Sequence, residues 1–250
     1  MTNLDGLVIA ERSCGETSKA ITLLTRELAC IEVYVRGGRK SKKSVSSTQL
    51  FCYAKFSLEQ KKDAHEVTHY YYNSSEPINL FYNIRLDAKK TALACYFADL
   101  LTYSTVSGEN IDEVMRLTLN TFHFLNKGDH DIELLKSIFE FRLLCETGYR
   151  PNLIGCCHCY AVEDECMHFN LKSGLIECDS CVRNRESMYD ITFDKTLFHI
   201  VRFIALVEYE RLYSFRISDI YQRRLTAFTE RFTEYYYGRR FETLKFYRLL

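Results

Sequence analysis

Residues 18–35 read SKAITLLTRELACIEVYV, and this stretch decides the fold of the N-terminal part of the chain. Apolar and polar residues alternate through it, most clearly from Ile31 to Val35. Successive side chains of a β-strand point to opposite faces, so this alternation is typical of a strand with one buried face. The stretch therefore predicts two neighbouring strands, Ser18–Thr25 and Ala29–Val35.

Three more segments of the same region have the composition of strands. They are Leu4–Arg12, Gln49–Leu58 and His65–Asn73, the last of which is rich in Val, Thr and Tyr. Five short strands within about 75 residues favour a small closed β-barrel of the OB type, which has no exposed sheet edge. A small β-sandwich is the alternative.

From Asn83 onward, apolar residues recur at the three-to-four-residue spacing of a helix. Gly128 is expected to stop one helix, and Gly148 with Pro151 another. The predicted helices are Leu86–Leu101, Ile111–Leu125, Asp131–Thr147, one that resumes near Asp194, and one from about Ile217 to Tyr237. The chain is therefore predicted to have an α+β fold, with a barrel followed by helices.

Composition excludes several classes of protein. Of the 250 residues, 47% are hydrophobic, which is enough for a packed core. No apolar run reaches the ~18 residues that span a bilayer, and the N-terminus, with Asp5 before a short apolar stretch, does not resemble a signal peptide. No phosphate-binding loop of the type G-x-x-x-x-G-K-[ST] occurs. We expect a cytoplasmic protein that does not hydrolyse ATP.

The formal net charge is zero, but the charge is unevenly distributed. Residues 1–62 carry a net charge of +5 and residues 188–250 a net charge of +3, whereas residues 63–149 and 150–187 carry −6 and −2. A nucleic-acid backbone responds to local potential, so the basic ends are compatible with DNA binding.

Six of the 11 cysteines lie between residues 156 and 181, and four of them form two C-x2-C pairs. Cys156 with Cys159, and Cys178 with Cys181, have the spacing of zinc knuckles. Four thiolates complete a tetrahedral shell and leave no position for water, so we expect one structural Zn²⁺. Nearby residues that could replace one ligand are Cys157, His158, Cys166 and His168.

His65-Glu66-Val67-Thr68-His69 matches the H-E-x-x-H pattern of zinc proteases. That pattern works only on a helix, where residues four apart advance ~6 Å on one face. The neighbouring residues predict a strand, in which the two histidines lie ~13 Å apart. The match is interpreted as coincidence, and a zinc-dependent hydrolase is kept as an alternative function.

The loop after the third predicted strand is basic and has no acidic residue from Gly37 to Leu58. Its cations are Arg36, Arg39, Lys40, Lys42 and Lys43. We expect them to bind phosphates without regard to sequence, with a slope of log affinity on log salt of roughly −4 if all five engage. Aromatic residues that could stack bases are Tyr53, Phe56 and Tyr70–Tyr72, although barrel core is the simpler role for most of them. The arginines at 223, 224, 231, 239, 240 and 248 could form a second phosphate-binding face or be ordinary surface charge.

Taken in order, these features resemble the RecO family of DNA repair proteins. The matching segments are Gly6–Ile9, Gly15-Glu16, Leu23–Thr25, Arg36–Lys42, Phe141–Leu144, Gly148–Leu153, and Cys156 with Cys159. Val35 stands where the family usually has Ala, Ala29 where Gly is common, and Cys157 is an additional thiol.

The resemblance implies an OB barrel (1–80), a helical domain in two parts (81–149 and 188–250) and an inserted zinc knuckle module (150–187). It also implies a nucleoid-associated, non-enzymatic recombination mediator that binds single- and double-stranded DNA and anneals complementary strands. Such a protein works with RecR to load RecA onto strands coated with single-stranded-DNA-binding protein (SSB), whose C-terminal tail docks on the helical domain. A zinc-stabilised scaffold that binds only proteins is the remaining alternative.

Overall fold

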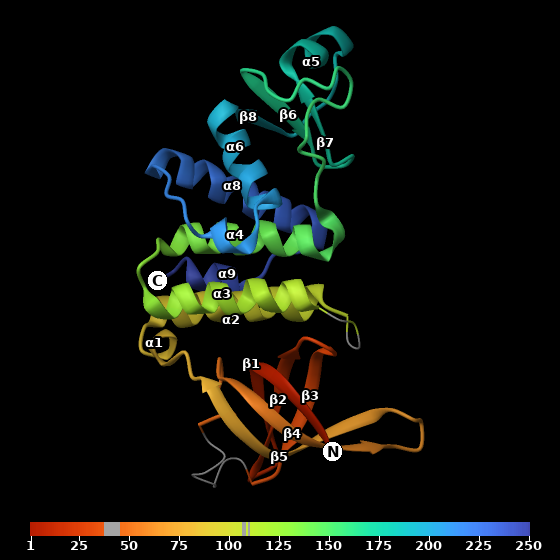
Figure 1. Cartoon of the computed structure of the whole chain (residues 1–250), viewed down its shortest axis with the longest axis vertical. Coiled ribbons are helices and arrows are strands. Elements are labelled where there is room, and N and C mark those ends of the chain that lie inside the picture. The colour runs from red at the N-terminus through yellow and green to blue at the C-terminus, as the bar shows by residue number, and fades with distance from the viewer. Residues whose placement is uncertain (38–45, 107–108, 110) are drawn as a thin grey trace. The chain divides into compact units, whose positions relative to one another are not determined.

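The structure, a computed structural model, describes residues 1–37, 46–106, 109 and 111–250. These residues form two compact units, Met1–Gly128 with Phe241–Leu250, and Asp129–Arg240 (Figure 1). The finer division of the sequence at residues 80, 149 and 187 stays a prediction. No helix in the described ranges is both long and apolar enough to cross a membrane.

The first unit begins with a closed barrel in the strand order β1-β2-β3-β5-β4, with β4 pairing back onto β1 (Figure 1). Its strands are β1 (Thr2–Cys14), β2 (Ser18–Thr25), β3 (Ala29–Val35), β4 (Tyr53–Lys62) and β5 (Thr68–Asn79). All neighbouring pairs are antiparallel except β3 with β5, which is parallel. This closure confirms the predicted barrel and excludes the β-sandwich.

Two strand boundaries differ from the prediction. Residues 49–52 form turns rather than the start of β4, and Phe51 adopts a φ of +66°, which a strand does not accommodate. Strand β5 begins at Thr68 rather than His65 and continues through Pro77 to Asn79. Alternate residues of β3, including Ile31, Val33 and Val35, are buried inside the barrel, as the sequence pattern predicts.

Helices α1 (Tyr82–Arg85), α2 (Ala88–Ser104), α3 (Asp112–Lys127) and α9 (Glu242–Tyr247) complete this unit. Helix α2 begins two residues later than predicted because Asp87 caps it, accepting a hydrogen bond of 3.0 Å from the backbone N–H of Lys90. Helix α3 ends at Gly128, whose φ of +76° is readily adopted only by glycine, and this confirms the predicted stop.

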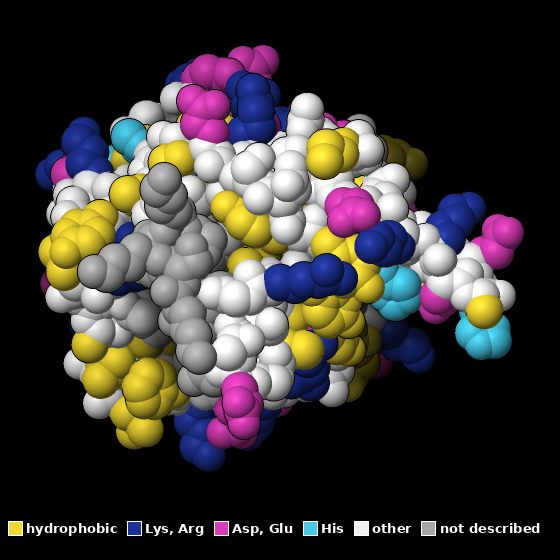
Figure 2. All heavy atoms as spheres, turned by 90° about the horizontal axis from the view of Figure 1, so that it is seen from below, with side chains coloured by type: hydrophobic (Ala, Val, Ile, Leu, Met, Phe, Trp, Pro, Cys, Tyr) yellow, Lys and Arg dark blue, Asp and Glu magenta, His cyan; other side chains and the backbone are white. Residues whose placement is uncertain are grey.

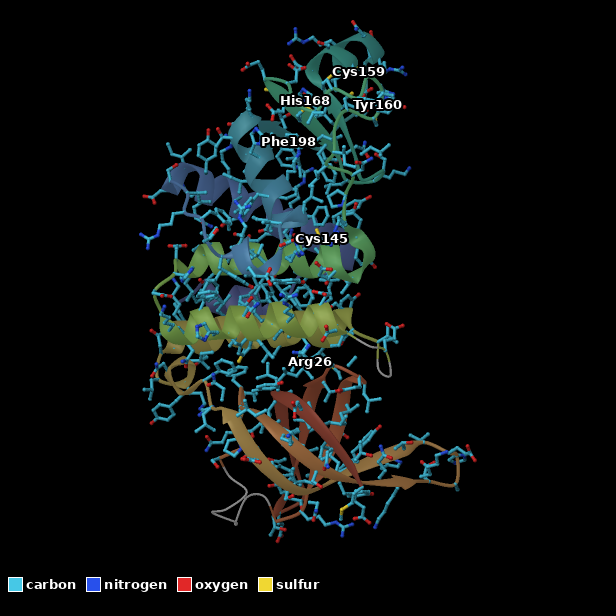
Figure 3. The ribbon with its side chains drawn as sticks, viewed as in Figure 1. Arg26, Cys145, Cys159, Tyr160, His168 and Phe198 are labelled. Carbon is cyan, nitrogen blue, oxygen red and sulfur yellow. The ribbon has the colours of Figure 1, made fainter. Side chains whose placement is uncertain are left out.

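The barrel and the helices of this unit share one aromatic cluster. The Phe122 ring of α3 lies 5.6 Å from that of Phe51, 5.8 Å from Phe81 and 6.5 Å from Phe97, measured between ring centres. Arg26, in the β2–β3 turn, also forms an ion pair with Asp112 at the start of α3 (Arg26 is labelled in Figure 3). These contacts anchor the barrel to the helices that follow it.

The second unit contains α4 (Ile132–Leu144), a π-helical turn (Cys145–Tyr149), α5 (Asp179–Arg185), α6 (Lys195–Leu206), α7 (Tyr209–Leu212) and α8 (Asp219–Tyr237). Helices α4 and α8 pack through Phe141, whose ring centre lies 5.2 Å from those of both Phe228 and Phe232. The helices predicted at 131–147, near Asp194 and up to Tyr237 are thereby confirmed.

A small sheet in the order β7-β6-β8 was not predicted. It is formed by β6 (Cys166–Asn170), β7 (Leu175–Cys178) and β8 (Ile191–Asp194). Phe169 and Phe193 are fully buried, and their rings lie 6.3 and 5.0 Å from that of Phe228 on α8. The cysteine-rich segment is therefore part of the packed unit rather than a separate loop.

Candidate nucleic-acid interface and metal centre

The two C-x2-C pairs come together at one end of the β6–β7 hairpin. The four sulfur atoms of Cys156, Cys159, Cys178 and Cys181 all lie within 4.8 Å of one another, and those of Cys159 and Cys178 are 3.5 Å apart. A tetrahedral zinc with Zn–S bonds of ~2.3 Å requires sulfur–sulfur separations of roughly 3.8 Å. The arrangement can hold one metal ion with little rearrangement. Figure 3 places Cys159 near the α5 end of this module.

The first knuckle depends on a tight turn that only a small residue permits. Cys156 accepts a hydrogen bond at its carbonyl from the N–H of Tyr160 and donates its own N–H to Ala161, at 3.0 and 2.9 Å. A Cβ on Gly155 would lie 2.8 Å from the Ala161 carbonyl oxygen, closer than a backbone contact allows. Gly155 therefore lets the loop fold back and turn its thiols inward.

Hydrogen bonds within the knuckle favour a thiolate at Cys156. Burial raises the pKa of this thiol, but hydrogen bonds from the backbone at Cys159, Cys178 and His158 outweigh burial and lower the pKa to about 6. Hydrogen bonding to Cys178, followed by burial, raises the pKa of Cys181 to about 12. Without a cation the thiols of Cys178 and Cys181 resist ionisation, so a divalent cation is the partner that this cluster suits.

His168 has a supporting role beside the knuckles. It is 6% exposed, its Nε2 lies 2.9 Å from Asp179 Oδ1, and its Nδ1 lies 3.1 Å from Thr192 Oγ1. Asp179 directly follows Cys178 of the four-cysteine cluster, so His168 supports the second knuckle from β6 (Figure 3). His168 and Cys166, both proposed from sequence as substitute ligands, do not belong to a metal-binding group of the described residues, whereas Cys157 and His158 do, together with Glu177.

The H-E-x-x-H segment is not helical. His65 lies in the turn between β4 and β5, Glu66 has a φ of +63°, and His69 is in β5 with its Nε2 3.1 Å from Asp63 Oδ2. The backbone N–H groups of His65 and Val67 both donate to Asp63 Oδ1. The protease arrangement requires both histidines on one helical face, and this turn does not provide one.

The candidate stacking aromatics of the barrel separate into two groups. Phe56 is fully buried, and Tyr70 and Tyr72 pack against the barrel core. Tyr71 lies between them in β5, so its side chain points to the outer face. Tyr53 is half-buried, and burial raises its pKa. Of the five aromatics proposed from sequence, Tyr71 is the one placed for contact with a ligand.

Cations and a second aromatic ring surround Tyr71. The guanidinium carbon of Arg36 lies 5.1 Å and Lys61 Nζ lies 5.5 Å from the centre of its ring, and the Tyr34 ring centre lies at 5.7 Å. Sequence reasoning missed Lys61, which the β4–β5 hairpin brings beside Tyr71, and Tyr34, which the β3–β5 pairing of the closed barrel brings there. We call Tyr34, Arg36, Lys61 and Tyr71 the barrel patch. Figure 2 shows Lys and Arg side chains beside hydrophobic ones on this end of the barrel, with acidic side chains among them.

The remaining cations of the predicted DNA-binding loop, Arg39, Lys40, Lys42 and Lys43, lie outside the described residues. Arg36 is exposed at the start of that loop and shows where the loop leaves β3. The proposal that the C-terminal arginines form a second phosphate-binding face stays a prediction, with Arg248 in the first unit and the other five in the second. Arg224, Arg231 and Arg240 form ion pairs with Asp194, Asp190 and Glu234.

Comparison with known families gives two matches that together cover nearly the whole chain. Residues 1–80 match the model of the recombination protein O N terminal region, and residues 85–245 match that of its C terminal region. The chain belongs to the RecO family. The junction between the two matches falls where the barrel gives way to the helices.

Individual relatives agree with the family models. The chain is 28% identical over 247 residues to the DNA repair protein RecO of Acetivibrio thermocellus, covering 98% of this chain and 95% of the relative. It is 26% identical over 243 residues to the DNA repair protein RecO of Bacillus pumilus, covering 97% and 91%. This RecO-family chain is thus similar along its full length to proteins of DNA repair, as the resemblance in the sequence predicts.

Proposed function

We propose that this RecO-family chain is a DNA-binding recombination mediator that performs no covalent chemistry. It binds single- and double-stranded DNA and anneals complementary strands. With RecR, it helps to load RecA onto strands coated with SSB. It does so in the cytoplasm, at the nucleoid. Family membership supports this role, and the barrel patch is the observation that carries it to particular residues.

The barrel patch combines the two kinds of group that single strands require. Aromatic rings stack bases without regard to sequence, and cations next to them bind the phosphates. In the free protein Lys61 Nζ lies near the Tyr71 ring, and its side chain is 50% exposed. Lys61 Nζ also lies 3.2 Å from Glu59 Oε1, so a base that stacks on Tyr71 would displace Lys61 from the ring and a phosphate would compete with Glu59 for it.

Annealing needs no reaction centre. A basic surface neutralises two phosphate backbones and holds them close, and base pairing then supplies the free energy. The loop cations Arg39, Lys40, Lys42 and Lys43 continue the chain directly from Arg36. They therefore extend the proposed phosphate-binding surface from the barrel patch into the 36–43 loop.

The four-cysteine cluster binds one Zn²⁺ with a structural role. Four thiolates close the coordination shell, so the ion has no open position for water or substrate. Its ligands join the loop before β6 to the start of α5, and this connection orders a segment with short strands. We expect removal of the ion to loosen the β6–β7 hairpin.

Fluorescence anisotropy with labelled single-stranded DNA at several salt concentrations tests the proposal. We expect the Arg39→Ala/Lys40→Ala variant to bind every sequence more weakly and to have a salt slope smaller by about 1.4. An unchanged slope would remove the loop from the interface. Absence of DNA binding by the unaltered protein would favour the protein-only scaffold.

Metal analysis tests the hydrolase alternative separately. A variant with Cys156, Cys159, Cys178 and Cys181 all changed to Ser should lose the structural ion. Changing His65 and His69 to Ala should leave the metal content unaltered. Loss of metal from the histidine variant would support the hydrolase instead.

A further inference from the structure

A second set of metal-binding donors lies beside the four-cysteine cluster. Donor atoms of Cys157, His158 and Glu177 all lie within 4.8 Å of one another. His158 Nε2 is 3.4 Å from Glu177 Oε2. The set offers one sulfur, one imidazole nitrogen and one carboxylate oxygen, and it has no part in the proposed structural zinc site.

Chain geometry explains why two donor sets occur side by side. Glu177 and Cys178 are consecutive residues of β7, so their side chains point to opposite faces of the strand. Cys157 follows the ligand Cys156, and its N–H donates to the carbonyl of Ile176 at 2.9 Å. That hydrogen bond fixes the first knuckle against β7 immediately before Glu177. One loop and one strand thus supply two different ligand sets.

Glu177 has a buried oxygen that the protein does not satisfy. Its Oε2 is inaccessible to solvent and has no hydrogen-bond partner among the described residues, although His158 lies near enough for electrostatic contact. Only 17% of the Glu177 side chain is exposed. A buried carboxylate oxygen without a partner costs free energy, and a cation coordinated between Glu177, His158 and Cys157 would remove that cost.

The chemistry of the donors indicates the class of ion. Mixed sulfur, nitrogen and oxygen ligands suit borderline ions such as Zn²⁺ and Co²⁺ rather than Mg²⁺ or Ca²⁺, which prefer oxygen alone. Bonds of ~2.0–2.3 Å place tetrahedral ligands roughly 3.3–3.8 Å apart, so the set closes around an ion through small side-chain movements. Three protein ligands leave one coordination position open.

We infer that Cys157, His158 and Glu177 bind a second divalent ion of the zinc class, in an open three-ligand site. A thiolate and a carboxylate neutralise its charge. The filled four-cysteine site carries a formal charge of −2, and this charge attracts the second cation. The open position admits water or an external ligand, which the first site does not.

Metal titration of the purified full-length protein tests this inference. The metal-free protein is titrated with Zn²⁺ alone, and bound ions per chain are counted by native mass spectrometry. We expect two ions in the unaltered protein and one ion in each of the Cys157→Ser and Glu177→Gln variants. In a parallel Co²⁺ titration, we expect Cys157→Ser to abolish the weaker of two sulfur-to-cobalt absorption phases.

A matched variant and a reciprocal variant complete the design. Cys166→Ser removes a thiol of the same module that lies outside both sets, and it should retain two ions. Cys156→Ser/Cys159→Ser should lose the tightly bound ion. One ion in the unaltered protein, retained in Cys157→Ser but lost in Cys156→Ser/Cys159→Ser, would overturn the second site and leave the proposed structural zinc intact. If the unaltered protein binds one ion and only Cys157→Ser loses it, the structural zinc site is overturned and the second site stands.

Discussion

The guanidinium carbon of Arg36 lies 5.1 Å from the centre of the Tyr71 ring, so the residue that follows β3 contacts the outer face of β5. A cation next to an aromatic face is attracted by the negative potential of the ring. The contact holds the start of the basic loop against a ring that can stack a base. In the proposed interface, this contact would link a phosphate-binding residue with a base-stacking residue far from it in sequence.

Replacing Tyr71 by Ala tests the stacking contact. Stacking contributes ~1–3 kcal/mol per base, so Tyr71→Ala should weaken binding of single-stranded DNA by about 5- to 150-fold. Tyr71→Phe keeps the ring and should bind nearly as well as the unaltered protein. Anisotropy titrations at one fixed salt concentration measure both.

Tyr82 provides the control for that substitution. It is an exposed tyrosine of the same unit, and Arg85 lies 5.7 Å from its ring centre. Tyr82→Ala removes a similar ring and cation contact outside the barrel patch, so it should leave DNA affinity unchanged. Equal losses from Tyr71→Ala and Tyr82→Ala would show that stacking is not located at the barrel patch.

The cations of the barrel patch should be detectable in the salt dependence. Each phosphate contact on a single strand contributes about 0.7 to the slope of log affinity against log salt. The Arg36→Ala/Lys61→Ala variant should therefore have a slope smaller by about 1.4. Lys245→Ala, which removes an exposed cation of α9 in the same unit, should not change the slope. The idea fails if both variants keep the slope of the unaltered protein.

A buried ion pair lies in the second unit, and removing only one of its partners should be costly. Lys136 is 1% exposed, and its Nζ lies 3.1 Å from Glu140 and 2.8 Å from Glu230. Thr229 Oγ1 donates to Glu140 at 2.6 Å. Lys136→Met leaves a buried carboxylate without its cation and should lower the free energy of unfolding by ~3–5 kcal/mol.

A double variant separates the cost of an unpaired charge from simple loss of packing. Lys136→Met/Glu140→Leu replaces both partners by apolar groups, so it should be more stable than Lys136→Met alone. Urea unfolding followed by circular dichroism measures both. If the double variant is the less stable of the two, the unpaired Glu140 carboxylate costs less than the contacts that Leu fails to replace, among them the Thr229 hydrogen bond.

Sequence patterns predicted the elements whose signals are local. Barrel strands follow from alternation, and the stop at Gly128 follows from the left-handed φ that glycine permits. Ala29 has a φ of +51°, a left-handed conformation that glycine adopts more readily than alanine. The knuckle spacing likewise anticipated four thiols that the structure brings together.

Features that depend on tertiary contacts were not predictable. Strands β7 and β8 have four residues each, too few for a periodic signal. Strand β7 is held by pairing with β6, and Phe193 of β8 packs on Phe228 of α8. Lys136 and Glu140 have the spacing of an ordinary surface pair on a helix, and only the packing of α8 buries them. Glu177 was missed for a similar reason, since nothing in the sequence places its carboxylate beside Cys157.

Asp194 links the small sheet to α6, and its titration gives a prediction about acid stability. Its Oδ1 accepts a hydrogen bond of 2.9 Å from the Leu197 N–H, and its Oδ2 forms an ion pair with Arg224. Burial raises the pKa of Asp194, but the backbone N–H of Leu197 and the guanidinium of Arg224 outweigh burial and lower the pKa below 3.8. The carboxylate is therefore stabilised in the folded protein.

Because the folded-state pKa is lowered, this stabilisation is complete above the unfolded-state pKa of about 3.9 and is lost as the pH falls through the folded value.

Asp194→Ala should lower the free energy of unfolding by about 1 kcal/mol at pH 7, the usual effect of losing a helix cap. The difference between the two proteins should stay constant down to about pH 5 and shrink below about pH 4, where Asp194 begins to take up a proton. Asp194→Asn keeps a capping oxygen without the charge, so its free energy of unfolding at pH 7 should lie between those of the unaltered protein and Asp194→Ala. Urea midpoints measured from pH 7 to pH 3.5 test the sign, and a difference that widened toward acid would mean that the carboxylate is destabilised by folding.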